Sequence, residues 1–256
     1  MKLTDRDKKL LLDIQDYGLL PTKLLSSRHF DGIDSSTVLK RLRLLEKGNF
    51  LQRISGLENG SHAWCLMPKV SEELFGLPAK TSYPNQIVAH DLNLLKLRLR
   101  LEEVGIAQAW IPEHVIRKRM AESIPQRSFR CVNIPDGLMG VETVHSHKMA
   151  YAIELEMTAK SQSRYREIFH QYQRRMDLKG YWYVVERATI GNQLMKVARR
   201  YSFGSSSPFF LWSLFDEVLS DPIKAMVHWH GGELSLGEMF KQGGFATHTP
   251  TQAMGN

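Results

Sequence analysis

The chain has 256 residues, of which 43% are hydrophobic and 24% are charged, and its formal net charge is +7. This composition predicts a globular protein with one large or two smaller domains, and the positive charge favours a polyanionic partner such as nucleic acid. The apolar runs are too short for a membrane span, and two widely separated cysteines, Cys65 and Cys131, argue against a disulfide framework or a zinc ribbon. We therefore expect a cytoplasmic protein that makes no membrane contact.

Residues 1–68 predict a winged helix-turn-helix DNA-binding domain. Residues 4–18 have helical apolar spacing between a threonine N-cap and a terminating glycine, and residues 21–30 predict a short helix opened by proline. Residues 34–48 predict a third helix, and residues 50–66 a hairpin with a Gly-containing turn. Three helices followed by a two-stranded wing are the order of a winged helix-turn-helix.

The third helix supplies the candidate DNA contacts of this domain. Its apolar stripe faces the core, so its polar and basic residues face away: Ser35, Ser36, Thr37, Lys40 and Arg41. In a recognition helix such N-terminal residues enter the major groove, and Arg53 in the wing would touch the DNA backbone. The alternative is a solvated basic helix face. We expect double-stranded DNA as the partner.

Residues 69–86 predict a linker to a second domain, with a short helical piece at Val70–Leu74 followed by a Pro- and Ser-containing stretch. Residues 87–240 then predict a mixed α/β domain with the order helix, three strands, helix, strand, with an additional basic helix after the first strand. The last residues, 241–256, are rich in Gly, Thr and Gln and predict a mobile tail. The expected fold class is therefore mixed α+β and α/β.

Acidic residues gather in the middle of the second domain. Side chains alternate along a strand, so residues 150–157 place Glu154 and Glu156 on one face and apolar side chains on the other. Asp136 is expected on one strand and Glu154 on its hairpin partner, where the two could face each other across the ladder, and Lys160 follows the Glu-x-Glu strand. Carboxylates that converge are ligands for Mg²⁺ or Mn²⁺, so we predict a metal site formed by Asp136, Glu154 and Glu156. The alternative is a solvated strand face.

With these motifs in place, the second domain resembles the PD-(D/E)xK nuclease superfamily, with Pro135-Asp136 as its PD and Glu154-Leu-Glu156 at its (D/E)xK position. Glu156 replaces the usual lysine. Together with the winged helix, the chain resembles the plasmid replication-relaxation family and the MOB-C class of conjugative relaxases. The resemblance implies catalytic roles for Asp136, Glu154 and Glu156, with Lys160 acting on the phosphate or the water.

The resemblance also implies a function and partners. The chain is expected to nick or relax plasmid DNA at a transfer or replication origin by metal-dependent hydrolysis, with accessory mobilization or coupling proteins as partners. The alternative, also found among relatives, is a catalytically inactive DNA-binding regulator of plasmid replication or transcription.

Basic residues in the predicted helix after the Glu-x-Glu strand suggest a channel for the strand to be cut, with single-stranded DNA as a further partner. They are Arg164, Arg174 and Arg175. Phosphate contacts of this kind position a nucleic acid without reading its sequence. A solvated helix face is the alternative.

A second metal motif competes with the acidic one. His228-Trp-His230 matches the His-hydrophobe-His motif of tyrosine relaxases, in which a tyrosine is the nucleophile. Tyr165 and Tyr172 lie two turns apart on one face of a predicted helix and are the candidates for that role. A pair of loop histidines is the simpler interpretation. Glu102 and Glu103, near the end of a long predicted helix, are candidates for a further metal ligand.

Overall fold

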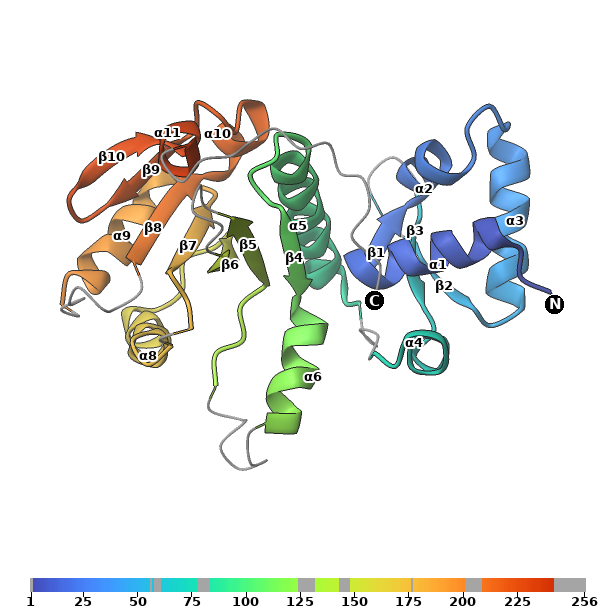
Figure 1. Ribbon diagram of the computed structural model, residues 1–256, viewed down its shortest axis with the longest axis horizontal. Helices are drawn as coiled ribbons and strands as arrows, with labels where there is room; N and C mark the ends of the chain where they lie inside the picture. The colour runs from blue at the N-terminus through green and yellow to red at the C-terminus, as the bar shows by residue number, and fades with distance from the viewer. Residues whose placement is uncertain are drawn as a thin grey trace. The chain divides into compact units, whose positions relative to one another are not determined.

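The structure is a computed structural model that describes residues 2–55, 57, 61–77, 83–123, 132–142, 148–175, 177–200 and 209–241 (Figure 1). The chain divides into two compact units. Unit 1 comprises residues 1–92 and 114–125, and unit 2 comprises residues 93–113 and 126–256. Among the helices of the described ranges, none is long and apolar enough to cross a bilayer. Cys131 and most of the predicted tail lie outside the described residues.

Unit 1 begins with three helices and a small sheet (Figure 1). Thr4 caps the first helix through a reciprocal capping box with Asp7, and Gly18 ends it at a φ of 82° that favours glycine. The strands are antiparallel in the order β1-β3-β2. The elements are α1 (Asp5–Tyr17), β1 (Leu19–Pro21), α2 (Thr22–His29), α3 (Ser35–Lys47), β2 (Leu51–Ile54), β3 (Ala63–Leu66) and α4 (Pro68–Phe75).

Unit 1 extends beyond the predicted domain end at residue 68. Much of the predicted linker is helix α4, whose buried Ser71 hydroxyl bonds to Gln15 of α1 and to the Leu77 carbonyl. Helix α6 (Glu113–Ser123) also belongs to this unit from His114 onward, because His114 Nε2 lies 3.3 Å from Gln15 Nε2 and Lys118 Nζ donates to a carbonyl next to α4. These bonds join segments that are distant in sequence.

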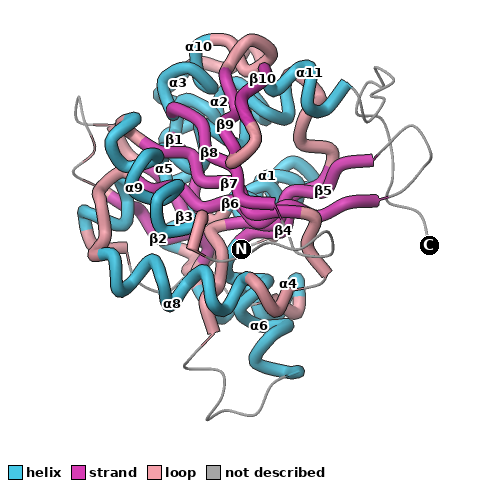
Figure 2. Tube along the Cα trace, turned by 90° about the vertical axis from the view of Figure 1, so that its left-hand side faces the viewer, coloured by secondary structure: helices cyan, strands magenta, loops and turns pink. Residues whose placement is uncertain are grey.

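Unit 2 is built on a seven-stranded sheet in the order β10-β9-β8-β7-β6-β5-β4. Strands β4 to β6 pair antiparallel, β6 to β8 parallel, and β8 to β10 antiparallel. Strands β5 and β6 lie side by side as an antiparallel pair (Figure 2). The elements are α5 (Asn85–Glu103), which belongs to this unit from Asn93 onward, β4 (Ala109–Pro112), β5 (Gly137–Glu142), β6 (Lys148–Glu156), α8 (Gln162–Tyr172), β7 (Gly180–Val185), α9 (Ala188–Ala198), β8 (Phe209–Leu214), α10 (Phe215–Ser220), β9 (Met226–Trp229), β10 (Gly232–Ser235) and α11 (Leu236–Lys241).

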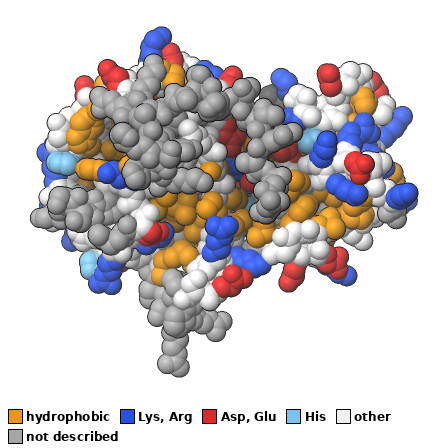
Figure 3. All heavy atoms as spheres, in the orientation of Figure 1, with side chains coloured by type: hydrophobic (Ala, Val, Ile, Leu, Met, Phe, Trp, Pro, Cys, Tyr) orange, Lys and Arg blue, Asp and Glu red, His pale blue; other side chains and the backbone are white. Residues whose placement is uncertain are grey.

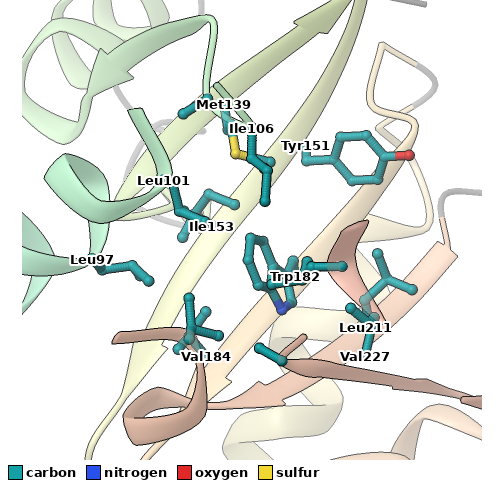
Figure 4. Close-up of a cluster of buried hydrophobic side chains, with 14 of the residues drawn as sticks. Leu97, Leu101, Ile106, Met139, Tyr151, Ile153, Trp182, Val184, Leu211 and Val227 are labelled. Atoms are coloured by element: carbon teal, nitrogen blue, oxygen red, sulfur yellow. The ribbon is translucent and has the colours of Figure 1, made fainter. Parts of the chain in front are cut away.

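Helices cover both faces of this sheet, so its inner strands β6, β7 and β8 have two mostly buried sides. On one face, Ile153, Trp182 and Val184 pack with residues of α5 and of the C-terminal elements (Figure 4). On the other face, Ala152 and Tyr183 pack against α8 and α9. The predicted alternation of β6 is therefore confirmed. Because its second face is also covered, Glu154 and Glu156 lie inside the unit.

The C-terminal part of unit 2 contains elements that the sequence pattern did not indicate. Strands β9 and β10 extend the sheet beyond β8. Helix α10 precedes β9, and helix α11 follows β10. His228, which we expected in a loop, lies in β9 and pairs in register with Trp212 of β8. These strands have only four residues each, which is too short for a clear period-two pattern.

Candidate functional site

Asp136 and Glu154 are brought together by the register of the β5–β6 hairpin. Gly137 pairs with Ile153, so Asp136 and Glu154 occupy the next rung of the antiparallel ladder and face one another. The backbone N–H of Leu155 donates to Asp136 Oδ2 at 2.8 Å, which fixes the Asp136 side chain at the edge of β6. Two of the three predicted acids are therefore neighbours.

Glu154 is buried, with 8% of its surface exposed, and two neutral groups hold one of its oxygens. The Tyr172 hydroxyl donates to Glu154 Oε1 at 2.5 Å, and Asn133 Nδ2 donates to the same oxygen at 2.7 Å. Asn133 Nδ2 also donates to the Tyr172 hydroxyl at 3.2 Å, which closes a three-membered ring of hydrogen bonds. We call Asn133 and Tyr172 the Glu154 clamp.

Burial raises the pKa of Glu154 to about 8, and the neighbouring charge of Asp136 adds to the increase. The Tyr172 hydrogen bond, the charge of Lys160 and the Asn133 hydrogen bond lower the same pKa without compensating for burial. An anion placed here without a direct cationic partner is a strong attractor for a proton or a metal ion.

Glu156, the third predicted acid, is buried but has a different partner. Lys160 Nζ donates to Glu156 Oε2, and Lys160 is anchored by its backbone, since its N–H donates to the Tyr165 hydroxyl at 2.9 Å. Its carbonyl accepts from Gln193 Nε2 of α9 at 3.3 Å. Lys160 therefore balances the charge of Glu156 directly.

The three predicted metal ligands do not converge on one point. Across the part of the chain that the structure describes, no group of three or more His, Cys, Asp or Glu residues is arranged to hold a metal ion. Mg²⁺, however, is commonly bound through one or two carboxylates, with waters and a substrate phosphate completing its octahedral shell. Asp136 and Glu154 are hard oxygen donors on one rung and fit such a two-carboxylate site.

The α3 residues predicted to contact DNA differ in their hydrogen-bond partners. Ser35 and Lys40 are exposed, whereas the hydroxyls of Ser36 and Thr37 donate to the N-cap residue Asp34. Arg41 Nε donates to Asp7 Oδ1 of α1 at 2.8 Å, and its Nη2 donates to Asp7 Oδ2. The guanidinium group thus holds α3 to α1.

Arg53 in β2 is exposed and lies 3.5 Å from Glu46 in a solvent-accessible ion pair. Several Lys and Arg side chains, drawn in blue, gather over the part of unit 1 that carries α1 to α3 (Figure 3). Exposed pairs of this kind are weak, so Arg53 can exchange Glu46 for a phosphate at little cost.

The three arginines predicted to line a channel differ in their partners. Arg164 pairs with Glu167 at 3.0 Å, and Arg175 makes a two-pronged pair with Asp177, with both bonds at 2.7 Å. Arg174 is exposed and lies 3.4 Å from His170 Nε2. Two of the three therefore have carboxylate partners within unit 2.

The residues of the alternative tyrosine mechanism are buried or have partners within the fold. Tyr165 and Tyr172 are fully buried, and burial raises the pKa of Tyr165 to about 12 and that of Tyr172 well above its usual value. A phenol that is harder to ionise is a poorer nucleophile. His228 Nδ1 lies 2.9 Å from Glu233, and its ring stacks on Trp212 at 4.1 Å.

The other candidate ligands have partners of their own. Glu102 pairs with Arg98 at 2.7 Å, and Glu103 with Arg100 at 2.6 Å, both along α5. These are helical i,i+4 and i,i+3 pairs of the common stabilising kind.

Sequence reasoning missed Asn133 as a functional candidate, and it singled out Tyr172 only as a possible nucleophile and not as a partner of Glu154. Asn133 belongs to no recognisable motif, and Tyr172 has the helical spacing of a core residue. Only the fold brings them to Glu154. No protein-family model, no curated protein and no solved structure matches this chain significantly.

Proposed function

We propose that this chain binds double-stranded DNA through unit 1 and hydrolyses a phosphodiester bond in unit 2 with Mg²⁺ or Mn²⁺. The observation that carries the proposal is the rung on which Asp136 and the buried Glu154 face each other. Two buried or half-buried acids side by side are unfavourable for stability, so their presence suggests a role in function.

Unit 1 supports the DNA-binding part of the proposal. Its order α1-β1-α2-α3-β2-β3 matches that of a winged helix-turn-helix, in which α3 would be the recognition helix and β2–β3 the wing. Ser35 and Lys40 at the exposed start of α3, and Arg53 on the wing, are the residues we assign to DNA. We leave Arg41 out of this set because Asp7 holds its guanidinium group.

Unit 2 supports the hydrolytic part. Apart from the inserted α6, the series α5-β4-β5-β6-α8-β7 follows the αβββαβ order of PD-(D/E)xK nucleases. Asp136 stands at the start of the second of these strands, and Glu154 and Glu156 lie near the end of the third. The origin-nicking activity of a relaxase without a catalytic tyrosine is the form of hydrolysis that this resemblance favours.

Asp136 and Glu154 would hold the cation, which when bound polarises the scissile phosphate and makes a bound water more acidic. The side chain of Lys160 is 41% exposed, so its ammonium group can reach a phosphate while Glu156 keeps it near β6. Water is the nucleophile in this proposal, because both tyrosines of α8 are buried.

The test is cleavage of a supercoiled plasmid that carries the candidate origin, incubated with the full chain and Mn²⁺. We expect nicking by the wild type and at least a hundredfold slower nicking by Asp136→Ala and Glu154→Ala, because each removes a metal ligand (roughly the 10²-fold scale of a lost electrostatic contact). Glu167→Ala, an exposed acid on α8, is the matched control. Equal nicking by all variants would refute the site.

A second function is favoured by a specific observation. Glu156 pairs with Lys160, and the three acids do not converge, which suits a DNA-binding regulator of plasmid replication or transcription that does not cut. DNA that is retarded in a gel by the wild type but stays uncut with either metal would favour the regulator. Absence of any retardation would refute both functions.

A further inference from the structure

The two carboxylate oxygens of Glu154 have different surroundings. Both donors of the Glu154 clamp reach Oε1, and no hydrogen bond within the described residues reaches Oε2. Tyr172 cannot turn away from this contact easily, because its ring stacks on Tyr181 with centroids 4.7 Å apart and planes 8° apart. One oxygen is therefore occupied by rigid neutral donors.

The clamp also reaches Asp136 through the backbone. The N–H of Asn133 donates to Gln171 Oε1 of α8, next to Tyr172. Helix α8 thus bonds to Asn133, three residues before Asp136, as well as to Glu154. The same helix therefore contacts both Glu154 and the segment that leads into Asp136.

The buried hydroxyl of Tyr183, on the strand next to Glu154, has no hydrogen-bond partner among the described residues. Tyr183 of β7 pairs in register with Glu154 and lies on the same face of the sheet. Its side chain is fully buried, and its hydroxyl has no hydrogen-bond partner among the described residues. Buried hydroxyls almost always find a partner, often an ordered water. The Tyr183 hydroxyl and Glu154 Oε2 thus lie on the same face of neighbouring strands, and neither has a hydrogen-bond partner among the described residues.

We infer that Asn133 and Tyr172 are positioning residues that hold Glu154 by Oε1, so that Oε2 alone is presented to a divalent cation whose bound water meets Tyr183. This inference rests on the proposed function, because it concerns the same carboxylates. It adds a selectivity that the two carboxylates alone do not have.

The selectivity follows from coordination chemistry. Ca²⁺ accepts flexible, often two-oxygen carboxylate ligation, whereas the smaller Mg²⁺ demands near-octahedral geometry and keeps several waters. A glutamate restricted to one ligand oxygen suits Mg²⁺ or Mn²⁺ and disfavours Ca²⁺. Removal of the clamp would free Oε1 and weaken that discrimination. Partners of this kind typically contribute about 10- to 100-fold to metal affinity.

The experiment is a titration of the full chain with Mn²⁺, followed by the loss of the free-ion electron paramagnetic resonance signal, and repeated with Ca²⁺ as competitor. The variants are Tyr172→Phe, which keeps the ring and its stack, and Asn133→Ala. Tyr181→Phe is the matched control, since it removes the same atom from an adjacent buried tyrosine. The Tyr181 side chain is buried, and its ring stacks on that of Tyr172.

We expect Tyr172→Phe and Asn133→Ala each to weaken Mn²⁺ binding by about tenfold and to make Ca²⁺ a better competitor, whereas Tyr181→Phe leaves both unchanged. Near-ultraviolet circular dichroism shows whether each variant is folded, and if one is not, the other decides. Clamp variants that bind Mn²⁺ and Ca²⁺ like the wild type would overturn the inference alone. A wild type that does not bind Mn²⁺, or that binds it equally well as Asp136→Ala, would overturn the proposed metal site itself.

Discussion

Two buried carboxylates, Asp7 in unit 1 and Glu154 in unit 2, have opposite environments. Burial by itself raises the pKa of Asp7, but hydrogen bonds from Arg41 and Thr4, with the charge of Arg41, lower it to about 2. At Glu154 the donors are neutral, a second acid lies alongside, and the pKa rises to about 8. The same chemical group is thus a stabilised anion in one place and an uncompensated one in the other.

The two acids differ in whether their contacts hold parts of the fold together. Asp7 caps α1 through Thr4 and holds α3 through Arg41, so every oxygen contact serves the fold. Glu154, in contrast, accepts hydrogen bonds only from the neutral groups of Tyr172 and Asn133. A buried acid that lacks a direct cation is neutralised by a proton, as the raised pKa of Glu154 indicates, and the metal ion that we propose would take the place of that proton.

The largest loss of stability is expected for Asp7→Asn. It leaves Arg41 without its anionic partner and should destabilise unit 1 by on the order of 3 kcal/mol. Because the pKa of Asp7 is lowered on folding, its contribution is complete above about pH 4 and disappears as the pH falls through about 2. Amide hydrogen exchange in α1 and α3 measures the loss, with exposed Asp5→Asn as control. Unchanged protection at pH 7 would contradict the ion-pair account.

Glu154→Gln, in contrast to Asp7→Asn, is expected to increase stability at high pH. The pKa of Glu154 is raised on folding, so wild-type stability declines as the pH rises from about 4.5 to 8, and then levels off. The variant lacks this decline and should be more stable at pH 9 by a few kcal/mol (about 1.4 kcal/mol for each pH unit of difference in pKa). Denaturant unfolding in EDTA, at pH 4.5 and pH 9, measures it. A variant that is less stable at pH 9 would show that the ionised acid stabilises unit 2.

Arg41→Lys tests whether the geometry or only the charge of the partner matters. Lysine cannot reproduce the two parallel hydrogen bonds to Asp7, so we expect about 1 kcal/mol lower stability of unit 1, less than for Asp7→Asn. The same exchange experiment on α1 and α3 is the measurement. Full retention of protection would mean that charge alone is sufficient.

Asp136→Asn should have the smallest effect. It removes the neighbouring negative charge and lowers the pKa of Glu154, but only partly, because burial is the larger cause and is unchanged. Carbon-13 nuclear magnetic resonance of the Glu154 side-chain carboxyl carbon, followed from pH 4 to pH 10 without metal, gives the shift. No movement of the titration would mean that Asp136 and Glu154 do not interact in solution.

Much of the local structure was predictable from sequence. The cap at Thr4, the stop at Gly18 and the apolar stripe of α3 each depend on residues within a few positions. The two faces of β6 follow from strand alternation alone, and the neighbouring positions of Asp136 and Glu154 from a hairpin register. Short strands such as β1 and β9 carried too little pattern to be recognised.

Only the tertiary structure decided which partner each charged side chain contacts. Arg41 faces Asp7 across 34 positions of sequence, Tyr172 reaches Glu154 from another element, and Lys160 turns back to Glu156. The sequence by itself determined the helices, the longer strands and the candidate acids, because these follow from local periodicity. It did not determine their protonation or their hydrogen bonds, because burial and long-range packing set the free energy of each charge.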